Sequence, residues 1–578
     1  MAGPTAPKDP EKARPFFYIL KDKDIFGERQ KDGTGIQFIY ESDGRLINSA
    51  QITGNVTDKE ELTLLETVEG FGRLVHSIGV SVETDRSEET AEFVFQMYGK
   101  KDLYGGGTNL TTSLKCDGME HRIYLSDYRW TEDDHVPGQI KILFAAPERM
   151  GKVSVRLFLN DGYEAPPEEE DLVIDMHSEE YCGMISRSLL QLGNPYRIRK
   201  AIEKSKAGKE VTLAYIGGSI TQGAGAIPIH TECYAYKSFQ LFQNRFSTQN
   251  NVRFIKAGVG GTPSELGMIR FDRDVLREGE RPDIVVIEFA VNDEGDETKG
   301  VCYESLVRKV LKLPWKPAVV LLFSVFANDW NLQERLRPVG DLYDLPMVSI
   351  RDAVTPQFSL KCGEGRILSK NQFFYDIFHP NNTGHTIMAD CLQYLFERCD
   401  AAEPARVGTF VEGMTEEQIL SEKLSGPAVI GADFERIFLL DKKNRYVGAK
   451  IRAGSFTSTD IELQSVEMDG SLTQTPEFPY NWMYDGSRLQ MAGFEMEITC
   501  KSLFLIFKDS GETDVGKANV FVNDVYCMTA DPHKNNWLHC NAVLLFWETE
   551  SRSHKVRIAV TEEDRNKKFT ILGFGYTI

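Results

Sequence analysis

The middle third of the chain constrains the fold most, because apolar β-branched runs alternate there with amphipathic helical stretches. The runs are VTLAYI from residue 211, NVRFIK from 251, DIVVIEF from 283, AVVLLFSVF from 318 and LPMVSI from 345. Strands buried on both faces have this composition. Helical patterns cover residues 234–245, 264–276, 303–311 and 383–399. Together they predict a three-layer, doubly wound parallel α/β sheet that binds ligands at the carboxyl ends of its strands.

The two flanks have a different pattern, with short alternating strands between turn clusters. On the amino-terminal side they are 36–40, 74–80, 90–97, 139–144 and 152–159, followed by an acidic connector at 164–171 and a helical segment at 185–206. On the carboxyl-terminal side they are 435–440, 503–508, 519–525, 542–546 and 554–560, with one helix near 415–423. This predicts a β-sandwich domain over 1–184, the α/β domain over 185–403 and a second β-sandwich, a jelly roll, over 404–578.

Charge and cysteine usage exclude several classes of protein. The 578 residues contain 66 Lys and Arg against 86 Asp and Glu, a net charge of −20 without a compensating basic run, so we expect neither nucleic acid nor a membrane as partner.

The first residues, MAGPTAPKDPEKARPFF, lack the apolar core of a secretory signal, so the protein is intracellular or a signal has been removed. Ten cysteines without a CxxC pair predict buried free thiols, no metal and a cytoplasmic location.

Two glycine-rich turns follow the first two strands. Ser219 stands behind two glycines in YIGGSITQGAGA, where a strand-to-helix turn exposes its hydroxyl and points its amide at a developing oxyanion. Gly260 and Gly261 in AGVGGTPSELG follow the second strand, where the main chain can approach a reacting carbonyl closely. Taken alone, each segment is also typical of an ordinary flexible turn.

Three further polar residues fall at the same sheet edge. Asn292 ends the third strand in AVNDEG, and Asp376 and His379 stand three residues apart in YDIFHPNNTGH. That spacing suits a carboxylate that accepts from Nδ1 of the imidazole while Nε2 serves as a base. His385 falls within the start of the next helix and is expected to be structural.

In this order the segments resemble the four signature blocks of the SGNH hydrolases, also called GDSL esterases and lipases. GGSIT is similar to block one, VGGTPSELG to block two, AVND to block three and DIFHP to block five. The resemblance covers about 211–399, a third of the chain, and implies a flavodoxin-like core.

The resemblance implies that Ser219 is the nucleophile, His379 the base and Asp376 its orienting carboxylate. His379 would take the Ser219 proton during attack on an ester and return it to the leaving alcohol, and water would then release the acyl group. No cofactor and no metal is required.

The implied oxyanion hole consists of the Ser219 amide, the Gly261 amide and the Asn292 side chain. Gly260 is the alternative donor, because the register of VGGT is uncertain by one residue. One departure from the family is Gly218, which replaces the aspartate of the Gly-Asp-Ser form of block one.

The flanking domains resemble those of bacterial acetylxylan esterases and related carbohydrate esterases. The stretch FKDSGETDVGKANVFVND is expected to be a strand pair of such a sandwich, and no lid or membrane-seeking helix of a lipase is evident. The leading hypothesis is therefore a serine esterase that deacetylates xylan-derived oligosaccharides. The alternatives are an esterase for mannan or pectin acetyl esters, a lipid or a thioester, and a catalytically inactive glycan-binding protein.

Three tryptophans are candidate sugar platforms, since pyranose faces stack on indole rings. Trp330 follows the fourth strand, and Trp482 and Trp537 lie in loop-like stretches of the last domain. The alternative for each tryptophan is a structural role as a partly buried side chain. Because no Pro/Gly/Ser-rich linker occurs near 398–413, we also expect the last domain to dock rigidly and to contribute to the substrate site.

Overall fold

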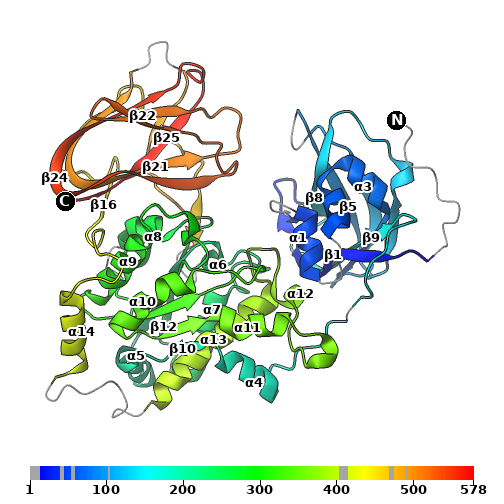
Figure 1. Ribbon diagram of the computed structural model, residues 1–578, viewed down its shortest axis with the longest axis horizontal. Coiled ribbons are helices and arrows are strands. Elements are labelled where there is room, and N and C mark those ends of the chain that lie inside the picture. Colours follow the sequence, from blue (N-terminus) through cyan, green and yellow to red (C-terminus); the bar gives the residue numbers. More distant parts are fainter. Residues whose placement is uncertain are drawn as a thin grey trace.

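Three units, each with its own β-sheet or sheets, follow one another along the chain in the computed structural model (Figure 1). The structure describes residues 13–39, 45–53, 59–101, 105–168, 170–277, 279–402, 414–467, 474–487 and 492–578. The predicted boundary at 404 lies outside the described residues, as does most of the segment 398–413. The domain boundaries therefore stay predictions, and each unit is described below by its own sheets.

The central sheet has six strands in the order β10-β15-β14-β13-β11-β12. These strands are β10 (Leu189–Gln191), β11 (Val211–Gly217), β12 (Val252–Gly258), β13 (Ile284–Glu288), β14 (Ala318–Phe323) and β15 (Met347–Ser349). All neighbours are parallel except β10 and β15. Counted from β11, the parallel strands have the order 2-1-3-4-5 of a flavodoxin-like doubly wound fold, whose switch point lies between β11 and β13. The predicted α/β core is confirmed.

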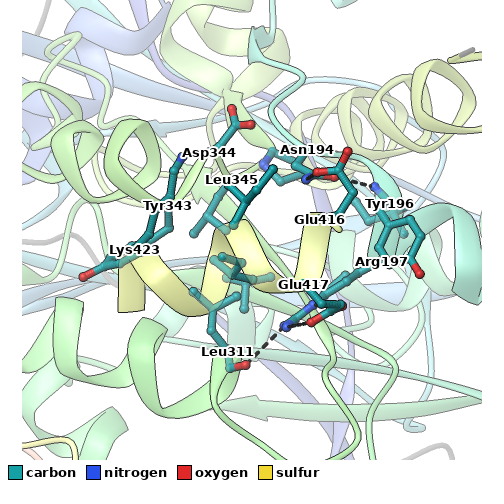
Figure 2. A pocket seen from close by; sticks show the side chains of 16 residues that line it. Asn194, Tyr196, Arg197, Leu311, Tyr343, Asp344, Leu345, Glu416, Glu417 and Lys423 are labelled. Carbon is teal, nitrogen blue, oxygen red and sulfur yellow. Dashed lines mark hydrogen bonds and ion pairs between the residues drawn. The ribbon is translucent and has the colours of Figure 1, made fainter. Parts of the chain in front are cut away.

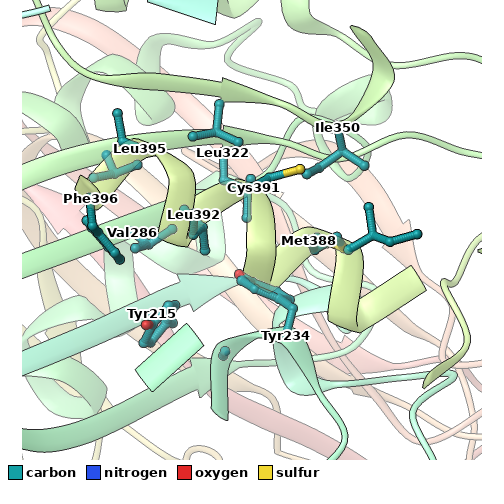
Figure 3. Close-up of a cluster of buried hydrophobic side chains, with 14 of the residues drawn as sticks. Tyr215, Tyr234, Val286, Leu322, Ile350, Met388, Cys391, Leu392, Leu395 and Phe396 are labelled. Carbon is teal, nitrogen blue, oxygen red and sulfur yellow. The ribbon is translucent and has the colours of Figure 1, made fainter. Parts of the chain in front are cut away.

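Helices cover both faces of this sheet and create two separate cores. The helices are α4 (Glu179–Ser186), α5 (Tyr196–Lys206), α6 (Ser219–Gln222), α7 (Tyr234–Phe246), α8 (Ser264–Phe271), α9 (Val301–Leu311), α10 (Gln333–Tyr343), α11 (Ile350–Phe358), α12 (Lys370–Phe373) and α13 (Asn382–Ala401). Tyr215 of β11 faces one core, together with residues of α7 and α13 (Figure 3), whereas its neighbour Ile216 faces the other, with residues of α8 and α9. This alternation along one strand is what a sheet buried on both faces requires.

The segment 185–206 is not one helix, contrary to the prediction. α4 ends at Ser186, β10 follows, and α5 begins at Tyr196. Gly193 has a positive φ of 56°, and Pro195 directly precedes α5, so the helical path is interrupted between them.

The amino-terminal unit consists of two antiparallel sheets that share one hydrophobic core. Their orders are β1-β9-β4-β7 and β2-β3-β8-β5-β6. The strands are β1 (Phe16–Phe26), β2 (Glu28–Arg29), β3 (Gly35–Ile39), β4 (Val75–Thr84), β5 (Thr90–Gly99), β6 (Asn109–Lys115), β7 (His121–Tyr124), β8 (Asp134–Phe144) and β9 (Met150–Leu159). Between β3 and β4 the structure adds α1 (Arg45–Thr53), α2 (Lys59–Thr63) and α3 (Val68–Leu74), which the strand pattern did not predict.

The carboxyl-terminal unit is one curved antiparallel sheet with the order β16-β25-β21-β24-β22-β23, in which β17 also pairs with β21 and β20 with β25. The strands are β16 (Phe438–Leu440), β17 (Ala449–Arg452), β20 (Trp482–Tyr484), β21 (Phe494–Asp509), β22 (Ala518–Val522), β23 (Val525–Ala530), β24 (His539–Val560) and β25 (Phe569–Thr577). A break in register between Cys500 and Ser502 gives the two halves of β21 different outer neighbours, and the halves enclose a common core. The predicted jelly roll stays a prediction.

The expected strand pair in 507–524 is wrong. The end of β21 and β22 both lie in this stretch, but each pairs with β24, which lies between them. The GETD segment therefore connects non-adjacent strands instead of forming a hairpin. A small hairpin of β18 (Ser465–Glu467) and β19 (Gln474–Pro476) and the helix α14 (Glu416–Ser425) complete this part of the chain.

Candidate active site

Ser219 lies where the first parallel strand meets a short helix. β11 ends at Gly217 and α6 begins at Ser219, so the Ser219 amide lies in the first turn and has no acceptor within the helix. The residue is half-buried at the carboxyl edge of the sheet. This is the position at which a doubly wound fold binds ligands.

Gly218 makes room for Asn292, which follows β13. An ideal Cβ on Gly218 would lie 2.2 Å from Asn292 Oδ1 and 2.5 Å from its Nδ2. Any side chain at 218 would therefore displace the Asn292 amide. Gly218, which stands where the Gly-Asp-Ser form has an aspartate, therefore leaves the space that the Asn292 side chain occupies.

Ser219, His379 and Asp376 form one hydrogen-bonded chain. His379 Nε2 lies 2.9 Å from Ser219 Oγ, and its Nδ1 lies 2.9 and 3.0 Å from the two carboxylate oxygens of Asp376. A carboxylate can only accept, so Nδ1 carries the proton and Nε2 is left to accept from the hydroxyl. The three predicted residues thus lie together, in the arrangement that a Ser-His-Asp triad requires.

The loop between α12 and α13 fixes the carboxylate of Asp376. Its Oδ1 accepts from the amides of Phe378 and His379 over 2.7 and 2.8 Å, and the Tyr375 amide donates to the His379 carbonyl over 2.8 Å. Burial raises the pKa of Asp376, but the His379 charge and these hydrogen bonds outweigh burial, so its pKa lies below the ordinary value. The group is therefore ionised at neutral pH.

The two glycines after β12 differ in their surroundings. Gly260 is buried against the Gln222 side chain of α6, the helix that begins with Ser219. Gly261 is exposed, has a φ of 70°, and faces Trp537 and His539 of the carboxyl-terminal unit. Among the described residues, neither amide has a hydrogen-bond partner. Both are available as donors.

Glu288 lies beneath the site and was missed from the sequence. It is fully buried at the end of β13, accepts from Thr221 Oγ1 over 3.2 Å and also bonds to Ser324. Burial raises its pKa to about 7. The only sequence signal was a lone carboxylate at the end of an otherwise apolar strand.

His385 is structural, as predicted. It is fully buried, its Nδ1 accepts from the Tyr234 amide over 3.1 Å, and its Nε2 donates to the Ala224 carbonyl over 3.1 Å. Burial lowers its pKa to about 3, so it does not act as a second base at neutral pH.

Trp330 lies near the site at the end of an aromatic row. It stacks on Phe326 with 5.8 Å between ring centres, Phe326 meets Phe378 edge-on at 5.0 Å, and Phe378 precedes His379. The ring is half-buried. Its role in sugar binding stays a prediction.

The other two tryptophans differ sharply. Trp482 is only 5% exposed, lies in the strand β20 and packs on Phe494 and Phe574 within the core, so the prediction that it binds substrate is wrong. Trp537 is 45% exposed and lies over Gly261. It remains a candidate sugar platform.

The amino-terminal unit also contacts the catalytic loop, which the sequence did not indicate. Lys23 of β1 donates from Nζ to the Phe374 carbonyl, and Asn371 donates to the Lys21 carbonyl over 3.2 Å. A cavity of about 240 Å³ lies beside this loop, between α1 and the segment after β14. It is lined by Asn48, Gln51, Ile52, Phe326, Ala327, Asn328, Lys370, Ile377 and Phe378.

A second cavity, of about 260 Å³, lies at the opposite edge of the sheet (Figure 2). Its lining includes Ala318 and Pro346, at the starts of β14 and β15, and α14 covers it. Glu417 of α14 pairs with Arg197 over 2.9 Å. This cavity is remote from the carboxyl ends of the strands and from Ser219.

The ten cysteines are free thiols, as predicted, and seven of them are buried. The predicted burial is wrong for Cys182 and Cys527, which are exposed, and for Cys362, which is half-buried. Among the described residues, no group of three or more His, Cys, Asp or Glu side chains is arranged to hold a metal ion. In the same part of the chain, no helix combines the length and apolarity needed to cross a membrane.

Comparison with protein families gives one match in the central domain. Residues 215–387 match the model of the GDSL-like Lipase/Acylhydrolase family, which confirms the family predicted from the four segments. A search of curated proteins finds no match.

A solved two-domain esterase shares this fold. A two-domain esterase (CEX) active on acetylated mannans is 24% identical, with a TM-score of 0.54, over 68% of this chain and 98% of that chain. The same esterase co-crystallised with mannopentaose gives the same score and identity, over 97% of that chain. A catalytic mutant of Axe2, an acetylxylan esterase from Geobacillus stearothermophilus, is 18% identical over 33% of this chain and 95% of its own, with a TM-score of 0.26.

Proposed function

Since residues 215–387 match the model of the GDSL-like lipase/acylhydrolase family, we propose that this chain is a serine esterase that removes O-acetyl groups from oligosaccharides. The observation that carries the proposal is the bonded chain from Ser219 Oγ through His379 to Asp376. It lies beside three potential oxyanion donors: the Ser219 amide, an amide of the Gly260–Gly261 turn and the Asn292 side chain.

The proposed reaction has two steps. Ser219 Oγ attacks the acetyl carbonyl while His379 Nε2 takes its proton, and the oxyanion forms opposite the backbone amides and Asn292. The carbon–oxygen bond to the sugar breaks, and His379 returns the proton to the leaving hydroxyl. Water, deprotonated by His379, then releases acetate from Ser219. Asp376, ionised throughout, orients the imidazole and stabilises its positive charge.

Two features support a sugar ligand. Trp537 presents an exposed indole face beside the Gly260–Gly261 turn, and the 240 Å³ cavity beside the His379 loop combines aromatic with amide and ammonium side chains. Aromatic faces and planar amides are the groups that bind pyranose rings and their hydroxyls. A long acyl chain would instead need an apolar channel.

Xylan-derived oligosaccharides are the substrate predicted from the sequence, and mannan-derived ones are the second candidate. The hypothesis of a mannan-derived substrate is supported by the solved two-domain esterase, which is active on acetylated mannans and shares the fold over 68% of this chain. Neither nucleic acid nor membrane is proposed as a partner, given the net charge of −20. A cytoplasmic location stays a prediction.

Acetate release from a substrate panel tests this function. The panel contains acetylated xylo-oligosaccharides, manno-oligosaccharides and pectin fragments beside long-chain acyl esters, with the Ser219→Ala variant as the control. We expect catalysed acetate release from at least one glycan and none by the variant. Preferred cleavage of long-chain esters would reject the glycan assignment.

A further inference from the structure

Two side chains of the carboxyl-terminal unit bind the carbonyls of the glycine turn after β12. Gln464 Nε2 donates to the Gly260 carbonyl over 2.9 Å, and His539 Nε2 donates to the Gly261 carbonyl over 3.0 Å. Successive peptide groups of one turn, next to the serine, are thus anchored from a different domain. The proposed reaction gives neither side chain a chemical role.

Gln464 determines the orientation of the peptide between the two glycines. Carbonyl and amide point in opposite directions in a trans peptide, so holding the Gly260 oxygen also directs the Gly261 N–H. The same bond limits rotation at Gly260, a residue without a side chain to restrict it. Gln464 is itself 8% exposed, and its Oε1 accepts from the Cys540 amide over 3.0 Å. It therefore has one defined orientation.

His539 holds the second peptide in a similar way. A carbonyl only accepts, so Nε2 carries a proton, while Nδ1 lies 3.0 Å from Asn535 Nδ2 and 3.4 Å from Asp509 Oδ2. The same Asn535 nitrogen donates to Asp509 Oδ2 over 2.6 Å. His539 is 6% exposed and Asp509 is fully buried, so the imidazole cannot turn without breaking a buried hydrogen bond.

The unit that carries these side chains is docked firmly. One hydrophobic core continues from α8 and α9 into Phe504, Ile506 and Leu572 of the carboxyl-terminal sheet. Arg273, which follows α8, is ion-paired with the buried Glu477 over 2.5 Å and donates to the Pro476 carbonyl over 3.1 Å. A rigid interface is what allows a donor in one domain to hold a turn in another.

We propose that Gln464 and His539 are positioning residues for the oxyanion hole, so that the carboxyl-terminal unit completes the catalytic site. Both act through the Gly260–Gly261 turn, whichever of its two amides faces the oxyanion. The inference rests on the proposed serine mechanism and not on the identity of the glycan. Without the two anchors, the glycine turn is free to rotate. The amide that faces the oxyanion must then lose this freedom each time the transition state forms, which raises the activation free energy.

The test compares Gln464→Met and His539→Phe, which remove the donors, with His539→Gln, whose Nε2 can take the place of the imidazole donor. His554→Phe is the matched control, because His554 lies on the same strand β24, is 5% exposed and has an Asn partner, Asn523, at Nδ1. Each variant is checked for native unfolding behaviour before kcat and KM are measured with nitrophenyl acetate.

We expect kcat to fall about tenfold or more in Gln464→Met and His539→Phe with KM changed less than about threefold, because an oxyanion donor acts in the transition state. His539→Gln should recover most of the loss, and His554→Phe should remain close to wild type. Folded Gln464→Met and His539→Phe proteins with kcat within about twofold of wild type would overturn the proposal. So would a loss of kcat in His554→Phe as large as that in His539→Phe.

A second measurement keeps the test valid if the natural substrate is not an acetyl ester. A fluorophosphonate reacts with an activated serine and leaves an oxygen in the oxyanion hole, so its rate of reaction with Ser219 depends on the same donors. We expect this rate to fall in the two donor-removing variants in parallel with kcat. An unreactive wild-type protein would contradict the serine mechanism, whereas equal reactivity of wild type and variants would contradict only the positioning role.

Discussion

Gly261 and Trp537 lie so close together that no side chain fits between them: an ideal Cβ on Gly261 would be 2.8 Å from Trp537 Cζ2. The indole therefore extends over the turn that lies beside the serine. A sugar whose acetyl group reaches Ser219 could stack on its exposed face. This contact is the direct structural reason to expect a contribution from the carboxyl-terminal unit to substrate binding.

Trp537→Ala should lower kcat/KM for an acetylated oligosaccharide about fivefold, because a lost aromatic contact costs on the order of 1 kcal/mol. Nitrophenyl acetate should be affected less than twofold, since it is too small to reach the ring. Trp482→Ala is the comparison: loss of this core residue should cost about 3–5 kcal/mol of unfolding free energy without changing the ratio of the two activities. Proportional changes on both substrates with Trp537→Ala would reject the platform.

Gly218→Ala should lower kcat on the order of 10²-fold, because the new Cβ displaces the Asn292 amide, a proposed oxyanion donor. Gly183→Ala is a matched control, since a Cβ there meets nothing within 4 Å. Steady-state kinetics with nitrophenyl acetate measures the effect. A fully active Gly218→Ala protein would mean that Asn292 is not needed in its present position.

Much of the site was predictable because its motifs are local. Asp376 and His379 are three residues apart on one loop, and Ser219 and Asn292 follow strands whose apolar runs place them at one edge. The helices α10 and α11 were missed, and each contains a proline, Pro338 or Pro356, that argues against a helix in sequence.

The support around the site could not be predicted in the same way. Gln464 and His539 reach the glycine turn from more than 200 residues away, and Lys23 approaches the His379 loop from the other flank. Single polar residues in β-rich stretches carry no sequence signal for such contacts. Trp482 was misjudged because the short strand β20, between turn-forming residues, resembles a loop.

His379→Ala should reduce kcat by about 10³-fold or more, and Asp376→Asn should cost less, because Asp376 acts on the imidazole and not on the substrate. Both variants are assayed on nitrophenyl acetate with circular dichroism as the check on folding. Equal and complete losses in folded proteins would show that Asp376 does more than orient His379.

Glu288→Gln should remove a pH dependence of stability. The folded pKa of about 7 lies above the ordinary value of 4.5, so the folded state binds the proton more tightly and wild-type stability falls as pH rises from about 4.5 to above 7. The slope is at most about 1.4 kcal/mol per pH unit. Urea unfolding at pH 5.5 and 8 should show a smaller decline in Glu288→Gln than in wild type; identical declines would contradict the assignment.

Acetyl esters should be cleaved much faster than octanoyl or longer esters in a nitrophenyl series. The cavity beside the His379 loop is small, about 240 Å³, and places amide and ammonium groups among its apolar side chains, so we expect it to bind a long acyl chain poorly. Comparable kcat/KM values across the series would favour a lipase or thioesterase.

The acetyl-enzyme tests the central claim most directly. Wild-type protein is mixed with an acetylated oligosaccharide, quenched in acid within one turnover, and analysed by peptide mass spectrometry. We predict one acetyl group on the peptide that contains Ser219 in the wild type, and neither that adduct nor acetate release in Ser219→Ala. Acetate release by Ser219→Ala, or an acetyl group on a different residue of the active wild type, would contradict the account.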